Sequence, residues 1–374
     1  MATKKATSSD PIHPKTLLVG VYAPNNQIGN PEYYYEEFLS LVNTLGLPYD
    51  STHFMKLRAP DNNMFLTKGK LEEVTKVVAD QGIEKAVFSV ILSPLQERNI
   101  ENAIGCNVID RQRLILEIFK KSAHTSEGKI QIEMAEVDYY KTRIIGRGTE
   151  LAQQAGIIGT KGPGETAKEE LKRYFAEKLH QAKKRLETLE RARDVQRKQR
   201  MNSKIPLICI IGYTNAGKSS LLNRIAKGAV LAEDKLFATL DTTTRELYID
   251  NQKKALISDT VGFISQLPHN LIAAFKSTLA ELHYANLLLH VVDVSNNAWK
   301  SQVNVVHETL KELDVTHPMI YVFNKIDKLT PEQREQLAVD VATYHPYVFI
   351  STLSKDGIKP LIDVLRSYRL TPVQ

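Results

Sequence analysis

Residues 205–225 read IPLICIIGYTNAGKSSLLNRI: an apolar run, a loop with two glycines, and an amphipathic segment. The loop, residues 212–219, has the spacing G-x-x-x-x-G-K-[ST]. Its glycines let backbone N–H groups face a phosphate, and the next helix adds the positive end of its dipole. Lys218 would reach the terminal phosphates, and the Ser219 hydroxyl would face Mg²⁺. The alternative, a glycine turn beside a surface lysine, does not account for the flanking patterns. We therefore predict a strand, a phosphate-binding loop and a helix.

Downstream of this loop the chain alternates β-rich and helical patterns up to about residue 368. We expect helices at 219–227, 270–284, 298–313, 331–342 and 357–368, an extended stretch at 237–249, and strands at 255–258, 287–294, 319–323 and 347–350. This alternation indicates an α/β, doubly wound fold with a mainly parallel sheet, whose ligands lie at the carboxyl ends of the strands. His290 and the single Trp299 are expected in its core.

Polar motifs follow three of these predicted strands. Asp259-Thr260-Val261-Gly262 offers a carboxylate that can hold Mg²⁺ through water and a glycine N–H that can reach a γ-phosphate. Asn324-Lys325-Ile326-Asp327 and Ser351-Thr352-Leu353 follow later strands. A carboxylate such as Asp327 accepts both the ring N–H and the exocyclic amine of guanine, a donor pair that adenine lacks. Each motif alone could be an ordinary turn or strand exit, but their order predicts a guanine nucleotide site.

The first part of the chain, from Lys15 to about Phe119, indicates a small parallel α/β unit. We expect strands at Thr16–Tyr22 and Lys85–Ile91, and helices at 33–45, 70–81 and 95–103. The sequence of this part contains no glycine phosphate loop. Scaffolding or binding is therefore its expected role, and a second nucleotide site is left open.

Between these two parts the sequence predicts a basic helical hairpin. Helices expected at 112–121 and 128–142 precede six glycines within residues 146–164, and a long helix is expected at 166–200. Residues 165–204 carry 13 Lys/Arg and 7 Asp/Glu, a surplus of six that equals the net charge of the whole chain, +6. Cations beside a glycine-rich loop favour contact with folded RNA. A solvated helix face and a membrane surface are the alternatives.

Length and composition describe a globular protein of more than one domain. The 374 residues are 43% hydrophobic and 25% charged, and a domain holds about 150 residues, so we expect two or three units. Cys106 and Cys209 are the only cysteines, which supports neither a disulfide framework nor a thiolate metal site. The longest apolar stretch, residues 285–294, is too short to span a membrane. Residues 1–14 lack an apolar signal core, so we expect a disordered tail and a cytoplasmic protein.

The motifs of residues 205–353 resemble those of the translation-factor-like P-loop GTPases. A longer stretch, about residues 15 to 368, is similar to the HflX family of ribosome-associated GTPases of the Obg/HflX group. That similarity is carried by residues 156–166 (GIIGTKGPGET), 237–241 (FATLD) and 127–133 (EGKIQIE). With these patterns we predict four parts: a tail at 1–14, an N-terminal α/β subdomain at 15–121, a helical hairpin at 122–204 with its glycine-rich loop at 144–165, and a GTPase domain at 205–374.

The family pattern also implies the site residues. Thr239 would be the switch threonine that meets Mg²⁺ and the γ-phosphate, although composition alone does not choose it over Thr242, Thr243 or Thr244. Lys218, Thr239 and Gly262 would be catalytic, and Ser219, Thr239 and Asp259 would hold the metal. The expected nucleotide-binding residues are Gly212, Tyr213, Thr214, Asn215, Ala216, Gly217, Lys218, Ser219, Phe237, Ala238, Thr239, Leu240, Asp241, Asp259, Thr260, Val261, Gly262, Asn324, Lys325, Ile326, Asp327, Ser351, Thr352 and Leu353.

Two positions bear on the rate of hydrolysis. Asn215 resembles the asparagine of potassium-stimulated members of the superfamily, which makes K⁺ a candidate second ion; an ordinary loop asparagine is the alternative. Phe263 stands where many small GTPases have a glutamine that orients the attacking water. Because phenylalanine cannot hold that water, we predict slow intrinsic GTP hydrolysis that rises when a partner completes the site.

The resemblance implies a GTP-hydrolysing switch that binds the large (50S) ribosomal subunit and its rRNA. Its role would be ribosome splitting or rescue, or subunit biogenesis. One alternative is an ATP-driven RNA remodelling enzyme that uses the N-terminal unit. Another is a nucleotide-dependent regulatory binding module at a membrane protease. We expect a monomer without an integral membrane segment.

Overall fold

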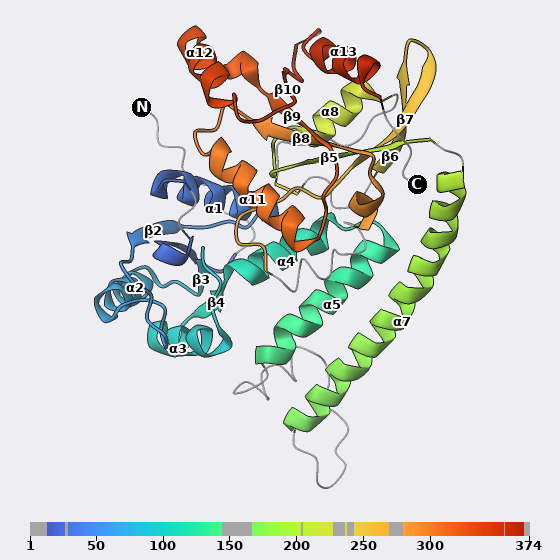
Figure 1. Cartoon of the computed structure of the whole chain (residues 1–374). Coiled ribbons are helices and arrows are strands. Elements are labelled where there is room, and N and C mark those ends of the chain that lie inside the picture. Colours follow the sequence, from blue (N-terminus) through green and yellow to red (C-terminus); the bar gives the residue numbers. More distant parts are fainter. Residues whose placement is uncertain are drawn as a thin grey trace, which may run out of the picture. The chain divides into compact units, whose positions relative to one another are not determined.

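The computed structural model describes residues 13–26, 29–143, 167–202, 205–226, 236–237, 243–268, 280–354 and 356–369. The chain divides into two compact units (Figure 1). The N-terminal unit extends to Ile115, and the C-terminal unit begins at Leu116 and also takes in residues 28–30. Within the ranges given above, no helix is both long and apolar enough to cross a membrane.

The N-terminal unit is the predicted parallel α/β structure. Its sheet has the order β2-β1-β3-β4, and every neighbouring pair is parallel. The strands are β1 (Thr16–Tyr22), β2 (Ser51–Lys56), β3 (Lys85–Phe88) and β4 (Asn107–Ile109); the helices are α1 (Pro31–Leu45), α2 (Lys68–Gln81) and α3 (Pro94–Ile104), with a 3₁₀ turn, η1, at Pro24–Asn26. The predicted strands and helices of this unit are confirmed, although β3 ends three residues earlier than expected.

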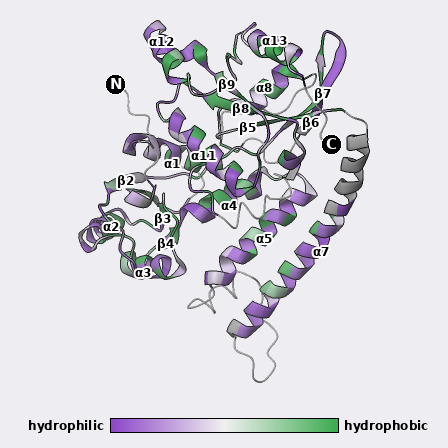
Figure 2. Cartoon of the chain, in the orientation of Figure 1, coloured by the Kyte–Doolittle hydropathy of each residue, from purple (hydrophilic) through white to green (hydrophobic). Residues whose placement is uncertain are grey.

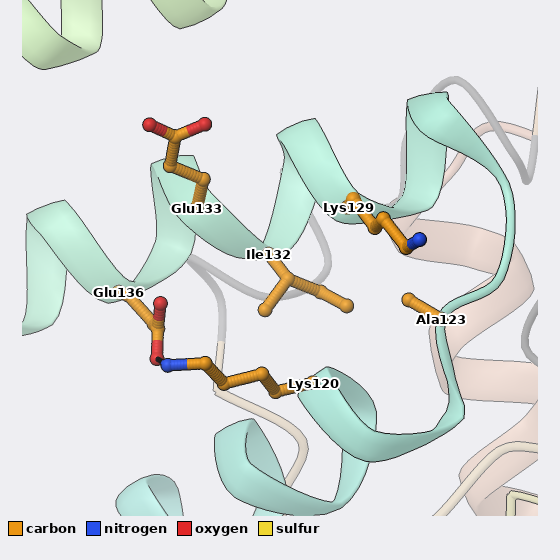
Figure 3. A pocket seen from close by; sticks show the side chains of 6 residues that line it. All are labelled: Lys120, Ala123, Lys129, Ile132, Glu133 and Glu136. Carbon is orange, nitrogen blue, oxygen red and sulfur yellow. Dashed lines mark hydrogen bonds and ion pairs between the residues drawn. The ribbon is translucent and has the colours of Figure 1, made fainter.

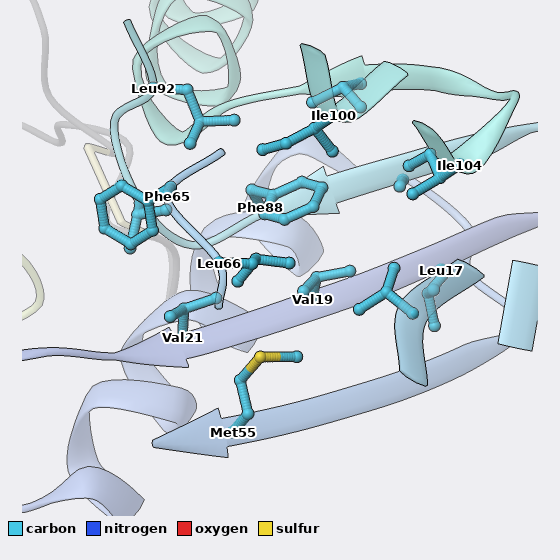
Figure 4. Close-up of a cluster of buried hydrophobic side chains, with 14 of the residues drawn as sticks. Leu17, Val19, Val21, Met55, Phe65, Leu66, Phe88, Leu92, Ile100 and Ile104 are labelled. Carbon is cyan, nitrogen blue, oxygen red and sulfur yellow. The ribbon is translucent and has the colours of Figure 1, made fainter. Parts of the chain in front are cut away.

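One face of this sheet carries the apolar core of the unit. Figure 4 shows Leu17, Val19 and Val21 of β1 beside Met55 of β2 and Phe88 of β3. Ile100 and Ile104, from the buried side of α3, belong to the same cluster. Because successive side chains of a strand point to opposite faces, the alternate residues of β1 all reach this core.

Two long helices form the predicted antiparallel hairpin. They are α5 (Ser126–Arg143) and α7 (Ala167–Asn202), and α4 (Arg111–Ser122) precedes them. Val137 of α5 packs with Leu171 and Phe175 of α7, whereas Glu133 pairs with Arg185 at 2.6 Å. The residue nearer the start of α5, Glu133, contacts the residue nearer the end of α7, Arg185. The two helices therefore run in opposite directions. The predicted glycine-rich loop lies outside the described residues.

The C-terminal sheet has the order β10-β9-β8-β5-β7-β6. All neighbouring pairs are parallel except β6 and β7, so the prediction of a mainly parallel sheet is confirmed. Its strands are β5 (Leu207–Gly212), β6 (Thr243–Ile249), β7 (Gln252–Asp259), β8 (Leu287–Asp293), β9 (Met319–Asn324) and β10 (Tyr347–Phe349). Its helices are α8 (Lys218–Ile225), α11 (Trp299–Glu312), α12 (Pro331–Asp340) and α13 (Lys359–Ser367), with 3₁₀ turns η2 (Ala280–Tyr284) and η3 (Ile326–Lys328).

Helices cover both faces of this sheet, as the doubly wound fold requires. On one face Ile208 and Ile210 of β5 pack with Leu221 of α8 and Leu361 of α13. On the other face Val292 of β8 and Phe323 of β9 pack with Trp299 and Val303 of α11. The prediction that Trp299 lies in the core is therefore confirmed. His290 is also buried, and burial lowers its pKa to about 3, which keeps the imidazole neutral.

In the C-terminal unit, the predictions for residues 255–258 and 270–284 need correction. The predicted strand at 255–258 begins at Gln252, because β6 and β7 form a hairpin whose two-residue turn is Asp250-Asn251. Both turn residues have positive φ, 53° and 62°, as a type I′ turn requires. Of the helix predicted at 270–284, the described residues 280–284 form a 3₁₀ turn.

Candidate functional site

The glycine loop connects the central strand of the sheet to a helix, as predicted. β5 ends at Gly212, and α8 begins at Lys218 with Gly217 as its N-cap residue. Gly217 has a φ of 98°, and a Cβ there would lie 2.3 Å from Asn324 Nδ2. Only glycine avoids that clash. The N-terminus of α8 has no side-chain cap, so its first N–H groups face the loop, where an anion would be bound.

Lys218 is buried beneath the loop. Its Nζ donates a hydrogen bond to the carbonyl of Tyr213 at 2.8 Å. Burial lowers the pKa of Lys218 to about 8, and the nearby Asp259 carboxylate opposes that shift only in part. A phosphate beside this ammonium would favour its charged form.

Ser219 and Asp259 form a set of oxygen ligands. The Ser219 hydroxyl donates to Asp259 Oδ2 at 2.8 Å, and Asp259 is fully buried at the end of β7. A hydroxyl and a carboxylate are hard oxygen ligands of the kind that Mg²⁺ prefers, so the two side chains fit this ion. Elsewhere among the described residues, no group of three or more His, Cys, Asp or Glu side chains has the arrangement of a metal site.

The segment after β7 runs alongside the glycine loop. Phe263 N–H donates to the carbonyl of Gly212 at 3.1 Å, and Thr214 N–H donates to the carbonyl of Phe263 at 2.7 Å. A Cβ on Gly262 would lie 2.9 Å from Lys218 Nζ, so the backbone passes directly over the ammonium. Thr260 is buried, and its hydroxyl donates to the carbonyl of Ile210 at 2.8 Å. The segment is therefore fixed by backbone and hydroxyl contacts to β5 and its loop.

Phe263 itself is buried. Its ring is apolar and packed away from solvent, so it presents no group that could orient a water molecule. This property of Phe263 is the reason we expect slow intrinsic GTP hydrolysis. The slow rate itself stays a prediction.

The predicted switch segment is described only at its start. Phe237 is buried, has a φ of 56°, and packs edge to face on Phe119 of α4 with ring centroids 4.6 Å apart. Ala238, Thr239, Leu240 and Asp241 lie outside the described residues. The alternative threonine, Thr244, lies in β6, where its hydroxyl donates to Ser258 Oγ at 3.3 Å.

The predicted guanine motifs meet the glycine loop. Asn324 is fully buried; its Nδ2 donates to the carbonyl of Ala216 at 2.9 Å, and its Oδ1 accepts from Thr352 N–H at 3.2 Å. Lys325 Nζ donates to the carbonyl of Asn215 at 2.9 Å. The Ser351 hydroxyl donates to Asp327 Oδ1 at 2.5 Å. The structure thus brings together the loops after β5, β9 and β10.

Asp293 belongs to this network and was not predicted from the sequence. Asp293 ends β8, and its Oδ2 lies 2.6 Å from Lys325 Nζ. Its Oδ1 accepts from the N–H and the hydroxyl of Ser295 at 3.0 and 2.6 Å. Its position could have indicated a role, because a carboxylate at the end of a predicted parallel strand lies at the ligand-binding edge of the sheet. Asp293 does not belong to any of the sequence motifs, so it was not predicted.

A pocket outside this network lies between α4 and α5. It has a volume of about 340 Å³ and is lined by Lys120, Ala123, Lys129, Ile132, Glu133 and Glu136. Figure 3 shows Lys120 pointing at Glu136, with the ammonium 2.8 Å from the carboxylate. None of the predicted nucleotide-binding residues lines it.

Buried polar side chains lie near the strand ends of the N-terminal unit and bond within that unit. Arg111 Nη2 donates to Glu37 Oε1 at 2.6 Å, and both side chains are buried. Tyr34 donates its hydroxyl to the carbonyl of Ser89 at 2.7 Å just beyond β3. These contacts give the buried polar groups partners inside the unit itself.

The fold and the site together define a P-loop GTPase. Three family models match the chain: a GTP-binding GTPase N-terminal region at residues 32–120, a GTP-binding GTPase middle region at 122–200 and a 50S ribosome-binding GTPase at 207–325. The GTPase HflX of Magnetococcus marinus is 41% identical over 333 residues, which covers 88% of this chain and 76% of that protein. The GTPase HflX of Escherichia coli K12 is 42% identical over 331 residues, which covers 88% and 78%.

A solved structure is also similar over most of the chain. It is a GTP-binding protein from the archaeon Sulfolobus solfataricus in complex with GDP, with 25% identity, a TM-score of 0.47, and coverage of 94% of this chain and 97% of that one. The identity to the curated relatives is high and extends over most of both chains. The chain belongs to the HflX GTPase family, and it binds guanine nucleotide and hydrolyses GTP.

Proposed function

We propose that this GTPase is a switch that associates with the large (50S) ribosomal subunit and its rRNA, and that it acts in ribosome splitting or rescue or in subunit biogenesis. The observation that carries the proposal is the exposed basic face of α7. Leu171, Phe175 and Ala182 are buried, whereas Lys183 and Lys184 are exposed. Exposed lysines on one face of a helix bind a nucleic-acid phosphate backbone with little sequence preference. The description of the family model at residues 207–325 supports the ribosomal partner.

The phosphate chemistry is assigned to the residues around α8. Lys218 would bind the terminal phosphates, Gly262 would approach the γ-phosphate with its N–H, and Thr239 would close over it. Ser219, Asp259 and Thr239 would hold Mg²⁺, which when bound neutralises charge on the phosphate oxygens. The buried ammonium of Lys218 and the hydrogen-bonded pair of Ser219 and Asp259 support these roles.

Recognition of guanine is assigned to Asp327 with Asn324, Lys325 and the loop after β10. The bond between Ser351 and Asp327 supports this role, because it holds the carboxylate at the ligand-binding edge. The amide oxygen of Asn215 is a ligand of the kind that K⁺ accepts, so K⁺ stays our candidate for a second ion.

The contact between Phe119 and Phe237 supports a route from the nucleotide to the helical hairpin. Phe237 lies two residues before Thr239, so an ordered Thr239 would constrain Phe237 as well. Phe119 lies in α4, and α5 begins four residues after α4 ends. The switch would therefore act by a population shift, in which the γ-phosphate orders the segment and hydrolysis releases it.

GTP turnover with and without purified large ribosomal subunits tests the proposal. Because Phe263 cannot orient water, we expect slow intrinsic turnover and stimulation by large subunits of at least about tenfold. The double variant Lys183→Glu/Lys184→Glu should lose most of that stimulation and keep its basal rate. Equal rates with and without subunits would refute the proposal.

The alternative of an ATP-driven enzyme predicts something different. If the N-terminal unit has its own ATP site, the protein hydrolyses ATP, and Asp327→Asn leaves that ATP turnover unchanged. If the protein has only the guanine site, wild type shows no ATP turnover. The buried pair of Glu37 and Arg111 at the strand ends of that unit favours the single site.

We further propose that the protein is a cytoplasmic monomer with domains at 15–121, 122–204 and 205–374.

A further inference from the structure

We propose that Arg224 is a positioning residue for guanine recognition, acting from the phosphate-binding helix on the loop that follows β10. Arg224 lies in the last turn of α8. Its Nε donates to the carbonyl of Thr352 at 3.0 Å, and its Nη2 donates to the carbonyl of Leu353 at 2.7 Å. The sequence did not single out Arg224, because the two ends of this contact are 128 and 129 residues apart. The inference rests on the proposed role of Asp327 in binding guanine.

The two carbonyls that Arg224 binds belong to consecutive peptide units. In a trans peptide the C=O and the following N–H point in opposite directions. The N–H groups on the far side of these two peptides belong to Leu353 and Ser354, and both donate to Ser351 Oγ, at 3.3 and 3.4 Å. Arg224 therefore holds the loop from one side, and Ser351 holds it from the other.

Ser351 passes this constraint to the base-binding carboxylate. Its hydroxyl has one hydrogen, which it donates to Asp327 Oδ1 at 2.5 Å, while its lone pairs accept from Leu353 and Ser354. The direction of that O–H thus depends on the loop that Arg224 fixes. A loosened loop would leave Asp327 less well aligned for the two donors of guanine.

Apolar packing contributes little at the tip of this loop. The Leu353 side chain is 74% exposed, so the tip of the loop gains little from apolar burial. Hydrogen bonds to the backbone are what order it, and the guanidinium fork can satisfy two acceptors at once. Lysine, with a single ammonium, would bind one carbonyl well but not both.

Calorimetry with GDP and inosine diphosphate on the full chain tests the inference. Inosine lacks the exocyclic amine, so the ratio of the two Kd values reports how well Asp327 is aligned. Arg224→Leu should weaken GDP binding about fivefold and inosine diphosphate binding less, so that the Kd for inosine diphosphate divided by the Kd for GDP falls. Arg224→Lys should fall between Arg224→Leu and wild type. Arg366→Leu, whose exposed arginine pairs with Asp250 and Asp363, is the matched control and should match wild type.

The outcomes separate the inference from the function on which it rests. If wild type binds the two nucleotides equally, the role of Asp327 fails, and the inference fails with it. If wild type prefers GDP and Arg224→Leu keeps the same ratio, only the inference is overturned. A parallel loss of affinity for both nucleotides would also overturn it, because that result indicates a general structural role.

Discussion

At the scale of single residues, burial changes the pKa of Lys218, the residue that would bind the terminal phosphates. Its ammonium lies under the glycine loop, and desolvation lowers its pKa from 10.5 to about 8. In the unfolded chain the pKa is higher, so between pH about 8 and 10.5 the unfolded state binds the extra proton and stability rises with pH. A bound phosphate reverses the preference, because it stabilises the charged form.

The shift predicts that nucleotide affinity depends on pH. Below pH about 8 Lys218 is already charged, and binding needs no proton; above it, binding must take up a proton, and affinity falls as pH rises. Calorimetry with GDP in two buffers of different ionisation enthalpy measures this uptake. We expect almost none at pH about 7 and a clear fraction of a proton at pH about 8.5. Constant affinity with no uptake would contradict the assignment of Lys218.

Asp293 gives a second prediction at this scale. It holds Lys325, which in turn binds the carbonyl of Asn215 in the glycine loop. Asp293→Asn should weaken GDP binding about fivefold, because a partly buried charged bond of about 1 kcal/mol is lost. Asp340→Asn is the matched control, since Asp340 pairs with Lys300 at 3.0 Å outside the site and should leave the Kd unchanged. The same Kd for Asp293→Asn and wild type would show that Lys325 needs no anchor.

At the scale of elements, the contact between α4 and the switch segment deserves a direct test. Phe119→Leu keeps an apolar side chain in a buried position and removes the edge-to-face contact with Phe237. We expect GDP affinity and basal turnover close to wild type, with stimulation by large subunits lowered about fivefold, since an aromatic pair contributes about 1 kcal/mol beyond burial. Phe175→Leu, in the core between α5 and α7, is the control. Full stimulation in Phe119→Leu would exclude this route.

Regular elements were predictable where apolar spacing was strong. β5, α8 and α7 follow directly from the runs and the three-and-four spacing of their apolar residues. β2 was missed because it lies at the edge of its sheet and only Met55 is buried, and β4 was missed because it has three residues. The start of β7 was missed because its turn, Asp250-Asn251, contains no glycine.

At the scale of the whole C-terminal unit, the strand order explains which parts of the site could be predicted from the sequence and which could not. β5 lies between β8 and β7, so the loops after those strands and after β9 and β10 reach one edge, and the motif residues there could be predicted by type. Which side chain binds which carbonyl could not be predicted. The contact of Asp293 joins the ends of β8 and β9, and the contact of Arg224 joins α8 to the loop after β10; only the folded register brings these residues together.

The proposed function makes the third phosphate decide whether the protein binds the ribosome. The most direct measurement is the affinity of the full chain for purified large ribosomal subunits, by sedimentation, with a non-hydrolysable GTP analogue and with GDP. The account predicts binding at least about tenfold tighter with the analogue, a coupling of more than about 1.4 kcal/mol. Equal binding with both nucleotides, or no binding with either, would contradict it.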